Sequence, residues 1–360
     1  MIYFKNKDAL LFYKDPSKFD KYTDKEILQY AIGANMYMPG NKRNVFEKLI
    51  DNAYNEVGSI TLCCEDAIKE VDLHDAEENI LTILDNLYAA SLNKVELLDT
   101  VPLIFIRVRC LEQFVRFSKR FTKEQLKFVA GFVFPKFSSS NGDAYLKIVE
   151  ELAVKHDEVL YAMPILEGEE LIYKENRFDE LEKIYDILAG YSKYILNIRV
   201  GGTDFSSRFG LRRSMYHSIY DIRVVSDCLI DILNFFLRME SGYVVSAPVW
   251  EYFSYDEESQ EIKGLKKELE LDMQNGFYGK TIIHPTQINY VNERYVVEYD
   301  EYQDAINILN SKGGVFKGSC GNRMNEVAPH TNWARKIVNR ANVFGVLDKG
   351  ASFDNKKEGR

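Results

Sequence analysis

Short apolar runs alternate with helical patterns through most of this 360-residue chain. Eight of these runs are strand-sized and mostly continuous in apolar residues, as expected when both faces of a parallel sheet are covered. The predicted strands span residues 33–38, 59–63, 103–108, 131–134, 159–165, 195–200, 243–247 and 281–283. Strands that alternate with helices in this number predict an α/β fold, a closed (β/α)8 TIM barrel more than an open doubly wound sheet.

The segments between the predicted strands carry the three- and four-residue apolar spacing of amphipathic helices. Over residues 80–87 this spacing is regular, and Asp75 and Glu78 are placed as a capping-box pair before it. Further helices are predicted over residues 142–153, 178–188, 215–238, 263–274 and 301–309. We expect residues 1–310 to form the barrel with an N-terminal extension, and residues 311–360 to form a C-terminal helical lid or oligomerisation segment.

The composition excludes several classes of function. The 46 basic residues against 55 acidic ones give a net charge of −9, which disfavours binding to a phosphate backbone. The first residues contain no apolar signal-peptide region, and the longest apolar runs, such as 128–134, are too short to span a bilayer. The five cysteines include no CxxC pair, which argues against a disulfide framework or a zinc knuckle. We therefore expect a cytoplasmic protein with no nucleic-acid or membrane partner.

In a barrel of this kind, functional side chains lie just past the carboxyl ends of the strands. Acidic residues follow three of the predicted strands at this point: Glu65 with Asp66, then Glu167, then Asp204. Carboxylates on neighbouring strand ends repel one another unless a cation joins them. Two carboxylates whose ion also binds water and substrate oxygens suit Mg²⁺ better than zinc, so we predict Glu167 and Asp204 as metal ligands. The alternative is that either residue only stabilises the first turn of the next helix.

Arg107 and Arg109 lie near the end of the predicted strand 103–108, and alternation along a strand would direct both to the same side. A guanidinium that points into the mouth of a barrel needs an anion, and the substrate is one candidate. The other is an ion pair with Glu65 or Asp66. The two interpretations are compatible if the substrate competes for the guanidinium.

Other signatures of catalysis are weak in this chain. Residues 279–281 read Gly-Lys-Thr, but a P-loop needs glycine at position 274 and a helix after the threonine, where Pro285 soon follows. His284 is one of five histidines, no two of which have metal-ligand spacing, and we expect it to be structural. No Gly-x-Ser-x-Gly motif or partnered cysteine indicates acyl transfer.

Several motifs, in the same order along the chain, resemble those of the HpcH/HpaI aldolase and citrate lyase β-subunit family. The most specific is Gly-Phe-Tyr-Gly-Lys-Thr-Ile-Ile-His-Pro-Thr-Gln-Ile over residues 276–288. The others are Met-Tyr-Met-Pro-Gly-Asn-Lys-Arg at 36–43, Cys-Cys-Glu-Asp-Ala at 63–67, Ile-Arg-Val-Arg at 106–109, Phe-Pro-Lys at 134–136, Leu-Glu at 166–167 and Gly-Thr-Asp at 202–204. The resemblance extends over residues 33–345. The N-terminal extension and residues 206–239 make the chain look more like the divergent barrel lyases encoded among tellurium-resistance and stress-response genes.

The resemblance implies a Mg²⁺-dependent carbon–carbon lyase or aldolase that acts on a 2-oxo acid and an acyl thioester, through an enolate and often in a trimer. By position, Glu167 and Asp204 would bind the metal. Arg107 would act in catalysis and, with Arg109, Glu65 and Asp66, in substrate binding. The family's coenzyme A entrance would lie near Pro39, Gly40 and Arg43. A cation and a guanidinium together stabilise the negative charge of an enolate.

This chain departs from the family pattern in residues that matter for the reaction. Cys63 stands where the family has aspartate, and Gly168 follows the metal glutamate in place of threonine. In the C-terminal segment, Asn325 aligns with an aspartate that serves the family as an acid or base, and asparagine cannot transfer a proton. We therefore assign that role to the adjacent Glu326. The alternative is a catalytically altered barrel that acts as a binding or assembly subunit in a stress-response pathway.

Overall fold

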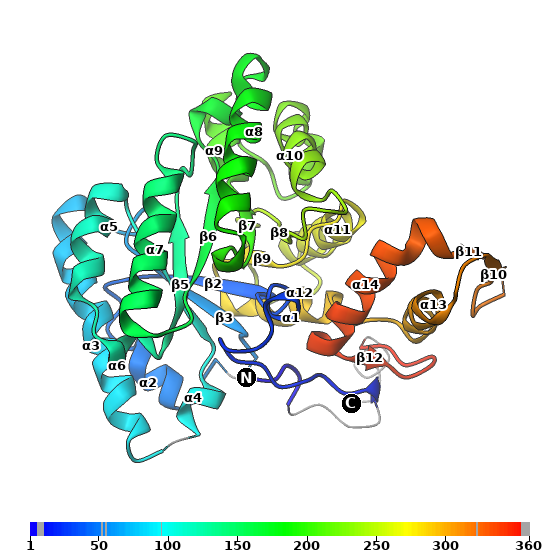
Figure 1. The fold of residues 1–360 in the computed structure, drawn as a ribbon, viewed down its shortest axis with the longest axis horizontal. Helices are drawn as coiled ribbons and strands as arrows, with labels where there is room; N and C mark the ends of the chain where they lie inside the picture. The colour runs from blue at the N-terminus through cyan, green and yellow to red at the C-terminus, as the bar shows by residue number, and fades with distance from the viewer. Residues whose placement is uncertain (6–10, 52, 55, 95, 322, 354–360) are drawn as a thin grey trace.

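An eight-stranded parallel sheet forms the centre of the protein (Figure 1). The computed structural model describes residues 1–5, 11–51, 53–54, 56–94, 96–321 and 323–353. The strand order is β8-β7-β6-β5-β4-β3-β2-β9, and a parallel bridge between Ala247 and Lys280 brings the two outer strands together. The strands are β2 (Ala34–Pro39), β3 (Ser59–Cys63), β4 (Leu103–Arg107), β5 (Val129–Phe134), β6 (Tyr161–Leu166), β7 (Ile198–Val200), β8 (Val245–Ser246) and β9 (Lys280–Ile282). The predicted TIM barrel and its eight strand positions are confirmed.

Every residue of β3, β4, β5 and β6 is buried, because side chains on one face fill the barrel and those on the other pack under helices. The register aligns the strand ends: Pro39 pairs with Cys63, and Cys63 with Arg107. This alignment places residues from different parts of the sequence at one mouth of the barrel. The predicted strands over 195–200 and 243–247 are longer than the observed β7 and β8.

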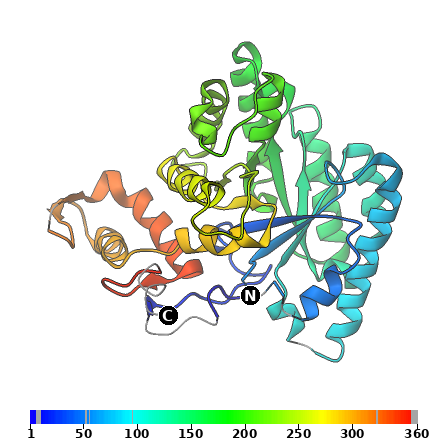
Figure 2. The same ribbon diagram turned by 180° about the vertical axis from the view of Figure 1, so that it is seen from behind.

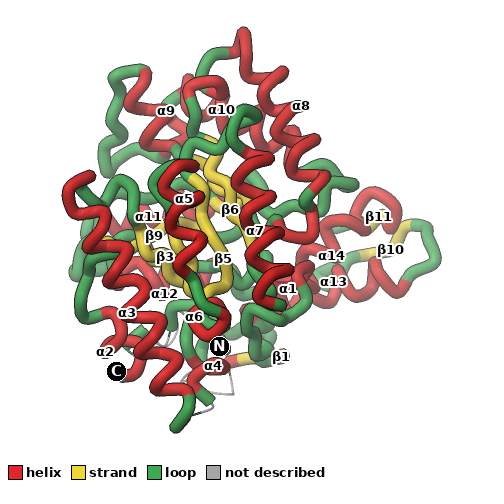
Figure 3. The backbone as a smooth tube through the Cα atoms, turned by 60° about the vertical axis from the view of Figure 1, so that its left-hand side comes forward, coloured by secondary structure: helices red, strands yellow, loops and turns green. Residues whose placement is uncertain are grey.

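Helices surround the sheet, and Figure 3 shows α3, α5 and α7 packed outside the strands. The barrel helices of seven or more residues are α3 (Leu73–Ser91), α5 (Leu111–Phe117), α7 (Gly142–His156), α8 (Lys174–Gly190), α9 (Gly202–Arg208), α10 (Arg223–Phe236), α11 (Gln260–Gln274) and α12 (Ile288–Arg294). The shorter ones are α1 (Lys25–Leu28), α2 (Val45–Ile50), α4 (Leu97–Thr100) and α6 (Lys123–Leu126). Each predicted helix has a counterpart, although 215–238 is divided into a short 3-10 helix at Ile219–Asp221 and α10.

The predicted capping box of Asp75 and Glu78 is wrong. The helix begins earlier, with Asp72 as its N-cap residue, so Asp75 lies inside the first turn. Asp75 instead forms an ion pair with Arg43, and Glu78 forms one with Arg120. Both carboxylates therefore form ion pairs with residues of other elements and do not cap their own helix.

The N-terminal extension and the end of the chain meet below the barrel. Strand β1 (Phe12–Lys14) pairs antiparallel with β12 (Val346–Leu347). Tyr3 stacks on Phe344 with ring centroids 4.6 Å apart, and its hydroxyl donates to the Ala31 carbonyl at 2.9 Å. The extension is therefore part of the packed structure and not a free tail.

The C-terminal part forms an arm that projects from the side of the barrel, as Figures 1 and 2 show from opposite sides. The arm consists of α13 (Tyr299–Asn310), β10 (Val315–Lys317), β11 (Met324–Glu326) and α14 (Val327–Phe344). It has its own apolar cluster, to which α13 contributes Ala305 and Ile308 and α14 contributes Ala334 and Ile337. Helix α13, from the part predicted as barrel, thus packs against α14, from the part predicted as lid.

Candidate active site

A cavity of about 380 Å³ opens at the carboxyl ends of the barrel strands. Strands β2, β3, β4, β6, β7 and β9 and the loops that follow them provide its walls. Its polar lining consists of Tyr37, Cys63, Asp66, Arg107, Glu167, Arg199, Thr203, Asp204 and Thr281. The volume suits a small organic acid, and the polar groups converge from separate strands as they do in barrel enzymes.

Arg107 is the centre of an ion-pair cluster at the end of β4. Its Nη2 lies 2.8 Å from Glu65 Oε2 and 3.2 Å from Glu167 Oε1, and its Nη1 lies 2.8 Å from Asp66 Oδ2. The guanidinium is only 6% exposed, and the nearby acids hold its pKa well above the usual value despite burial. The predicted ion pairs with Glu65 and Asp66 are therefore present, and they hold the guanidinium in the cavity that a substrate would enter.

Glu167 follows β6 and is 5% exposed. Burial raises its pKa to about 8; the positive charge of Arg107 opposes this rise, and the negative charges of Asp204 and Glu65 add to it. The Lys136 backbone N–H donates to Glu167 Oε1 at 3.2 Å. Lys136 adopts a positive φ of 48°, a conformation that costs free energy for a residue with a side chain and is often found at functional sites.

Asp204 lies in the first turn of α9 and lines the same cavity as Glu167. The two carboxylates repel each other, since the charge of Asp204 raises the pKa of Glu167. Burial lowers the pKa of the Lys136 ammonium, but its hydrogen bond to Glu65 and the charges of Glu65, Glu167 and Asp204 raise it overall. The predicted metal pair is therefore brought together in an acidic part of the cavity.

These residues fit a hard divalent ion and do not fit zinc. In the described part of the chain, no group of three or more His, Cys, Asp or Glu side chains is arranged to hold a metal ion. Mg²⁺ commonly uses one or two carboxylates and completes its octahedron with water and substrate oxygens. A cation between Glu167 and Asp204 would also offset the repulsion from Asp204, which adds to the rise that burial causes in the pKa of Glu167.

Arg109 does not follow Arg107 into the cavity. Its Nη1 donates to the Ile68 carbonyl at 3.0 Å and approaches the Cys64 carbonyl at 3.5 Å. Strand β4 ends at Arg107, so strand alternation no longer sets the direction of Arg109. This corrects the expectation that both arginines point to one side; Arg109 holds the loop that carries Glu65 and Asp66.

The residues expected at a coenzyme A entrance are spread along the rim. Pro39 is exposed at the end of β2 and lines the cavity. Gly40 and Arg43 turn away from it toward α3, where Asn79 Nδ2 donates to the Gly40 carbonyl at 2.7 Å and Arg43 pairs with Asp75. Only Pro39 of the three lies at the cavity itself.

Glu326 lies apart from the other predicted site residues. It ends β11 in the arm, and its backbone N–H donates to His330 Nδ1 at 3.1 Å. All residues that line the barrel cavity fall between Tyr37 and Ile283, so the arm provides none of them. Within one chain, Glu326 is not brought to Arg107.

The sequence analysis missed Arg199, the most buried charged residue of this cavity. It lies on β7, is 2% exposed, and donates from Nη2 to Thr281 Oγ1 on β9. Its guanidinium carbon lies 5.6 Å from the centre of the Tyr37 ring, and that of Arg107 lies 6.0 Å from the same ring. The sequence does contain an indication of this role, because Asn197 and Arg199 alternate with apolar residues in a run otherwise typical of a buried strand.

Lys280, in the Gly-Lys-Thr segment, has a structural role. Its ammonium is fully buried, 2.7 Å from Asp272 Oδ2 and 3.0 Å from Glu268 Oε1. A phosphate could not reach it without breaking both ion pairs. The structure thus agrees with the prediction that this segment is not a P-loop.

A family model described as C–C bond lyase of the TIM-barrel fold matches residues 26–346 of the chain. The chain belongs to this C–C bond lyase family. The match includes the cavity residues described above and most of the arm. A search of curated proteins finds no match.

Solved structures share the fold of this family member at low sequence identity. CitE from Mycobacterium tuberculosis, in complex with magnesium, acetoacetate and coenzyme A, has a TM-score of 0.54 and 17% identity, over 87% of this chain and 99% of CitE. Haloferax volcanii malate synthase, in a magnesium and glyoxylate complex, has a TM-score of 0.52 and 12% identity, over 72% of this chain and 74% of the synthase. At these identities the likeness shows the fold alone.

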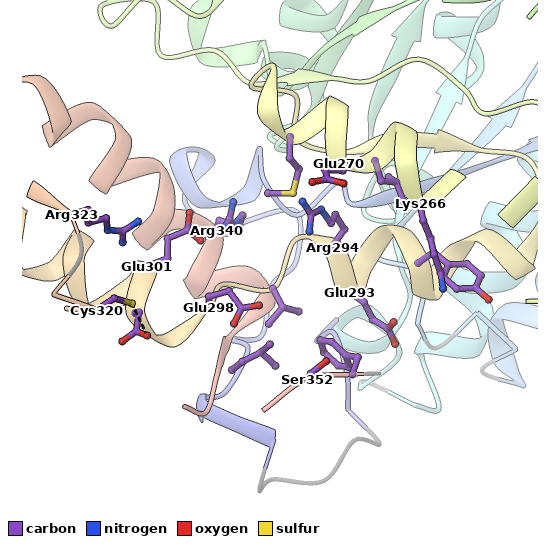
Figure 4. Close-up of a pocket in the computed structure, with 17 residues that line it drawn as sticks. Lys266, Glu270, Glu293, Arg294, Glu298, Glu301, Cys320, Arg323, Arg340 and Ser352 are labelled. Atoms are coloured by element: carbon purple, nitrogen blue, oxygen red, sulfur yellow. Dashed lines mark hydrogen bonds and ion pairs between the residues drawn. The ribbon is translucent and has the colours of Figure 1, made fainter. Parts of the chain in front are cut away.

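A larger cavity of about 1010 Å³ lies outside the barrel, where the arm meets α11 and α12 (Figure 4). Two of its arginines are already paired with acids, Arg340 with Glu301 and Arg323 with Asp304. It contains none of the predicted site residues.

Among the described helices, none has the length and apolar character needed to cross a bilayer.

Proposed function

We propose that this family member is a Mg²⁺-dependent lyase or aldolase that breaks or forms a carbon–carbon bond between a 2-oxo acid and an acyl thioester. The observation that carries the proposal is the buried cluster in which Glu167 and Asp204 share one cavity with the Arg107 guanidinium. Such a cluster offers a place for a divalent cation beside a fixed donor of hydrogen bonds. Both are suited to an oxygen that gains negative charge during the reaction.

The side chains have distinct tasks in this mechanism. When bound between Glu167 and Asp204, Mg²⁺ would polarise the 2-oxo group and stabilise the enolate charge. Arg107 is held by Glu65, Asp66 and Glu167, so its N–H groups are oriented before the substrate arrives. Asp66 is exposed, and its departure from Nη1 would free a donor for the substrate carboxylate or the developing oxyanion. Lys136 forms an ion pair with Glu65, with Nζ 2.8 Å from Oε1, and keeps that acid in position.

The metal assignment is tested by calorimetry of Mg²⁺ with oxaloacetate or pyruvate. Glu167→Gln and Asp204→Asn should each abolish the formation of the ternary complex. Glu169→Gln is a matched control, since this exposed acid pairs with Arg208 and does not line the cavity. Unchanged binding heats in the two cavity variants would reject the metal site.

Two observations support the acyl thioester as the second substrate. Pro39 lines the cavity and is exposed, and CitE was crystallised with coenzyme A. A thioester that enters past Pro39 would bring its acyl carbon toward Arg107. Competition between acetyl-CoA and a fluorescent coenzyme A analogue, in the wild type and in Pro39→Trp, tests this route; loss of binding in the variant supports it.

Glu326 can serve as an acid or base only at a different copy of the barrel, because within one chain it is absent from the cavity. We therefore propose a homo-oligomer, a trimer being one possibility, in which the arm of one subunit reaches the mouth of another. Mixing the inactive variants Glu167→Gln and Glu326→Gln tests the arrangement. Activity that returns on mixing requires that the two residues act from different chains, and no return would contradict it.

The second candidate function is a binding or assembly subunit without turnover. By the sequence resemblance, Asn325, which cannot transfer a proton, aligns with the family's catalytic aspartate, and it is buried in the arm. Carbon–carbon bond cleavage of any acyl-CoA by the purified protein, abolished by Glu167→Gln, would rule out this alternative.

A further inference from the structure

The barrel cavity contains a second arginine with no acid to balance it. Arg107 contacts three carboxylates. In contrast, no Asp or Glu oxygen of the described residues forms an ion pair with Arg199, whose protein hydrogen bond is to the neutral Thr281 hydroxyl. A guanidinium that is 2% exposed loses most of its hydration, and this cost needs an opposite charge or several acceptors to offset it.

Three buried hydrogen-bond donors in this region have no partner among the described residues. They are Nη1 of Arg199, the hydroxyl of Tyr37 and Nε of Arg107, and all three residues line the cavity. The Tyr37 ring is near both guanidinium groups, with its centre 5.6 Å from the central carbon of Arg199 and 6.0 Å from that of Arg107. The two arginine nitrogens can only donate, and the Tyr37 hydroxyl, which can also accept, forms no hydrogen bond with either of them, so the set calls for acceptor oxygens from outside the chain.

The charge of the set selects the kind of acceptor. Water would accept hydrogen bonds but would leave the Arg199 charge unbalanced, whereas a carboxylate provides two oxygens and a negative charge. The ion pairs of Glu65, Glu167 and Asp66 are formed with Arg107. Arg107 is therefore already balanced by acids, whereas the Arg199 guanidinium is left for an anion.

We propose that Arg199, with Tyr37 and Thr281, binds a second carboxylate of the substrate, so that the 2-oxo acid taken by this enzyme is a dicarboxylate. This inference rests on the proposed function for the placement of the first carboxylate and the 2-oxo group near Glu167 and Asp204. The cavity of about 380 Å³, which Arg199 lines together with Glu167 and Asp204, has room for a short dicarboxylic acid. Arg199 is then a residue that determines specificity.

Calorimetry in Mg²⁺ compares two pairs of acids of equal chain length: oxaloacetate with 2-oxobutyrate, and 2-oxoglutarate with 2-oxopentanoate. We expect the wild type to bind at least one dicarboxylate about 10- to 100-fold more tightly than its monocarboxylate partner, the range for a charged hydrogen-bonded contact. Arg199→Met should reduce this preference to less than about threefold and leave the monocarboxylate affinities unchanged. Arg208→Met, at an exposed arginine of α9, is the matched control and should keep the preference.

A purely structural role for Arg199 makes a different prediction for stability. If the guanidinium is an unbalanced buried charge kept for a ligand, Arg199→Met should have a thermal midpoint equal to or above that of the wild type. A lower thermal midpoint, together with an equal loss of affinity for monocarboxylates and dicarboxylates, would overturn the proposal. Should Arg199→Met not fold, Arg199→Lys and Tyr37→Phe provide the same comparison, with a partial loss of preference expected in each.

The result is separable from the proposed lyase function. Without Mg²⁺, glutarate and succinate should still bind in a manner that depends on Arg199, even if no metal site exists. Mg²⁺-dependent binding of monocarboxylic 2-oxo acids with no preference for dicarboxylates would leave the lyase proposal in place and overturn this one.

Discussion

Gly201 leaves no room for a side chain beside Glu167. A Cβ atom at residue 201 would stand 2.2 Å from Glu167 Oε2 and 2.4 Å from its Cβ. The loop after β7 therefore packs directly on the carboxylate that follows β6, and glycine is required for this close approach.

Gly201→Ala should therefore displace the Glu167 carboxylate. We expect a loss of about 1–3 kcal/mol in the free energy of unfolding, the usual cost of overpacking, together with at least a tenfold loss of Mg²⁺ affinity. Urea unfolding and calorimetry measure the two effects. Gly190→Ala is the control, since a Cβ there meets no atom within 4 Å. It should lower neither the free energy of unfolding nor the Mg²⁺ affinity.

Stability in the absence of Mg²⁺ should fall as the pH rises, because of Glu167. Burial raises the pKa of Glu167 from 4.5 to about 8, so in this window the folded state holds a proton that the unfolded state has released. The free energy of unfolding therefore decreases between pH 4.5 and about pH 8. Glu167→Gln should show a weaker decrease when the two unfolding curves are compared from pH 5 to 8.5. Parallel curves would contradict the assignment of a buried, protonated Glu167.

Arg107→Lys should keep the positive charge but lose the planar arrangement of hydrogen-bond donors. A lysine cannot contact Glu65, Asp66 and Glu167 at once through a planar fork, so the oxyanion would lose an oriented donor. We expect kcat to fall about 100- to 1,000-fold, as when one oxyanion donor is removed. Arg116→Lys, on the surface beside Glu77, is the control for the same chemical change. Full activity in Arg107→Lys would exclude a catalytic role for the guanidinium.

Lys280 should be among the most sensitive structural positions of the barrel. Lys280→Met leaves Glu268 and Asp272 buried without their shared cation, which costs about 3–5 kcal/mol in comparable cases. Lys183→Met removes an exposed pair with Asp179 and should cost less than about 0.5 kcal/mol. The difference between the two, measured by urea unfolding, checks that residues 279–281 are structural. A mild effect of Lys280→Met would contradict this.

Much of the site followed from local sequence. The strands that end before Glu65 and Glu167 are strand-sized runs of mostly apolar residues, and parallel strands bring their carboxyl ends to one mouth. The sequence alone therefore placed Arg107, Glu167 and Asp204 together, since their positions depend only on strand limits and topology.

Tertiary structure decided the roles of the two other arginines. Arg109 was expected in the cavity and Arg199 was overlooked, yet Arg109 binds loop carbonyls and Arg199 lines the cavity. Beyond the last strand residue, loop geometry and not alternation sets the direction of a side chain, so Arg109 could not be placed from its neighbours. That Arg199 forms no ion pair with any described residue depends on which strands surround it in the barrel. The sequence determined the barrel and its acidic strand ends through local periodicity, whereas long-range packing decided which charges are paired and where Glu326 lies.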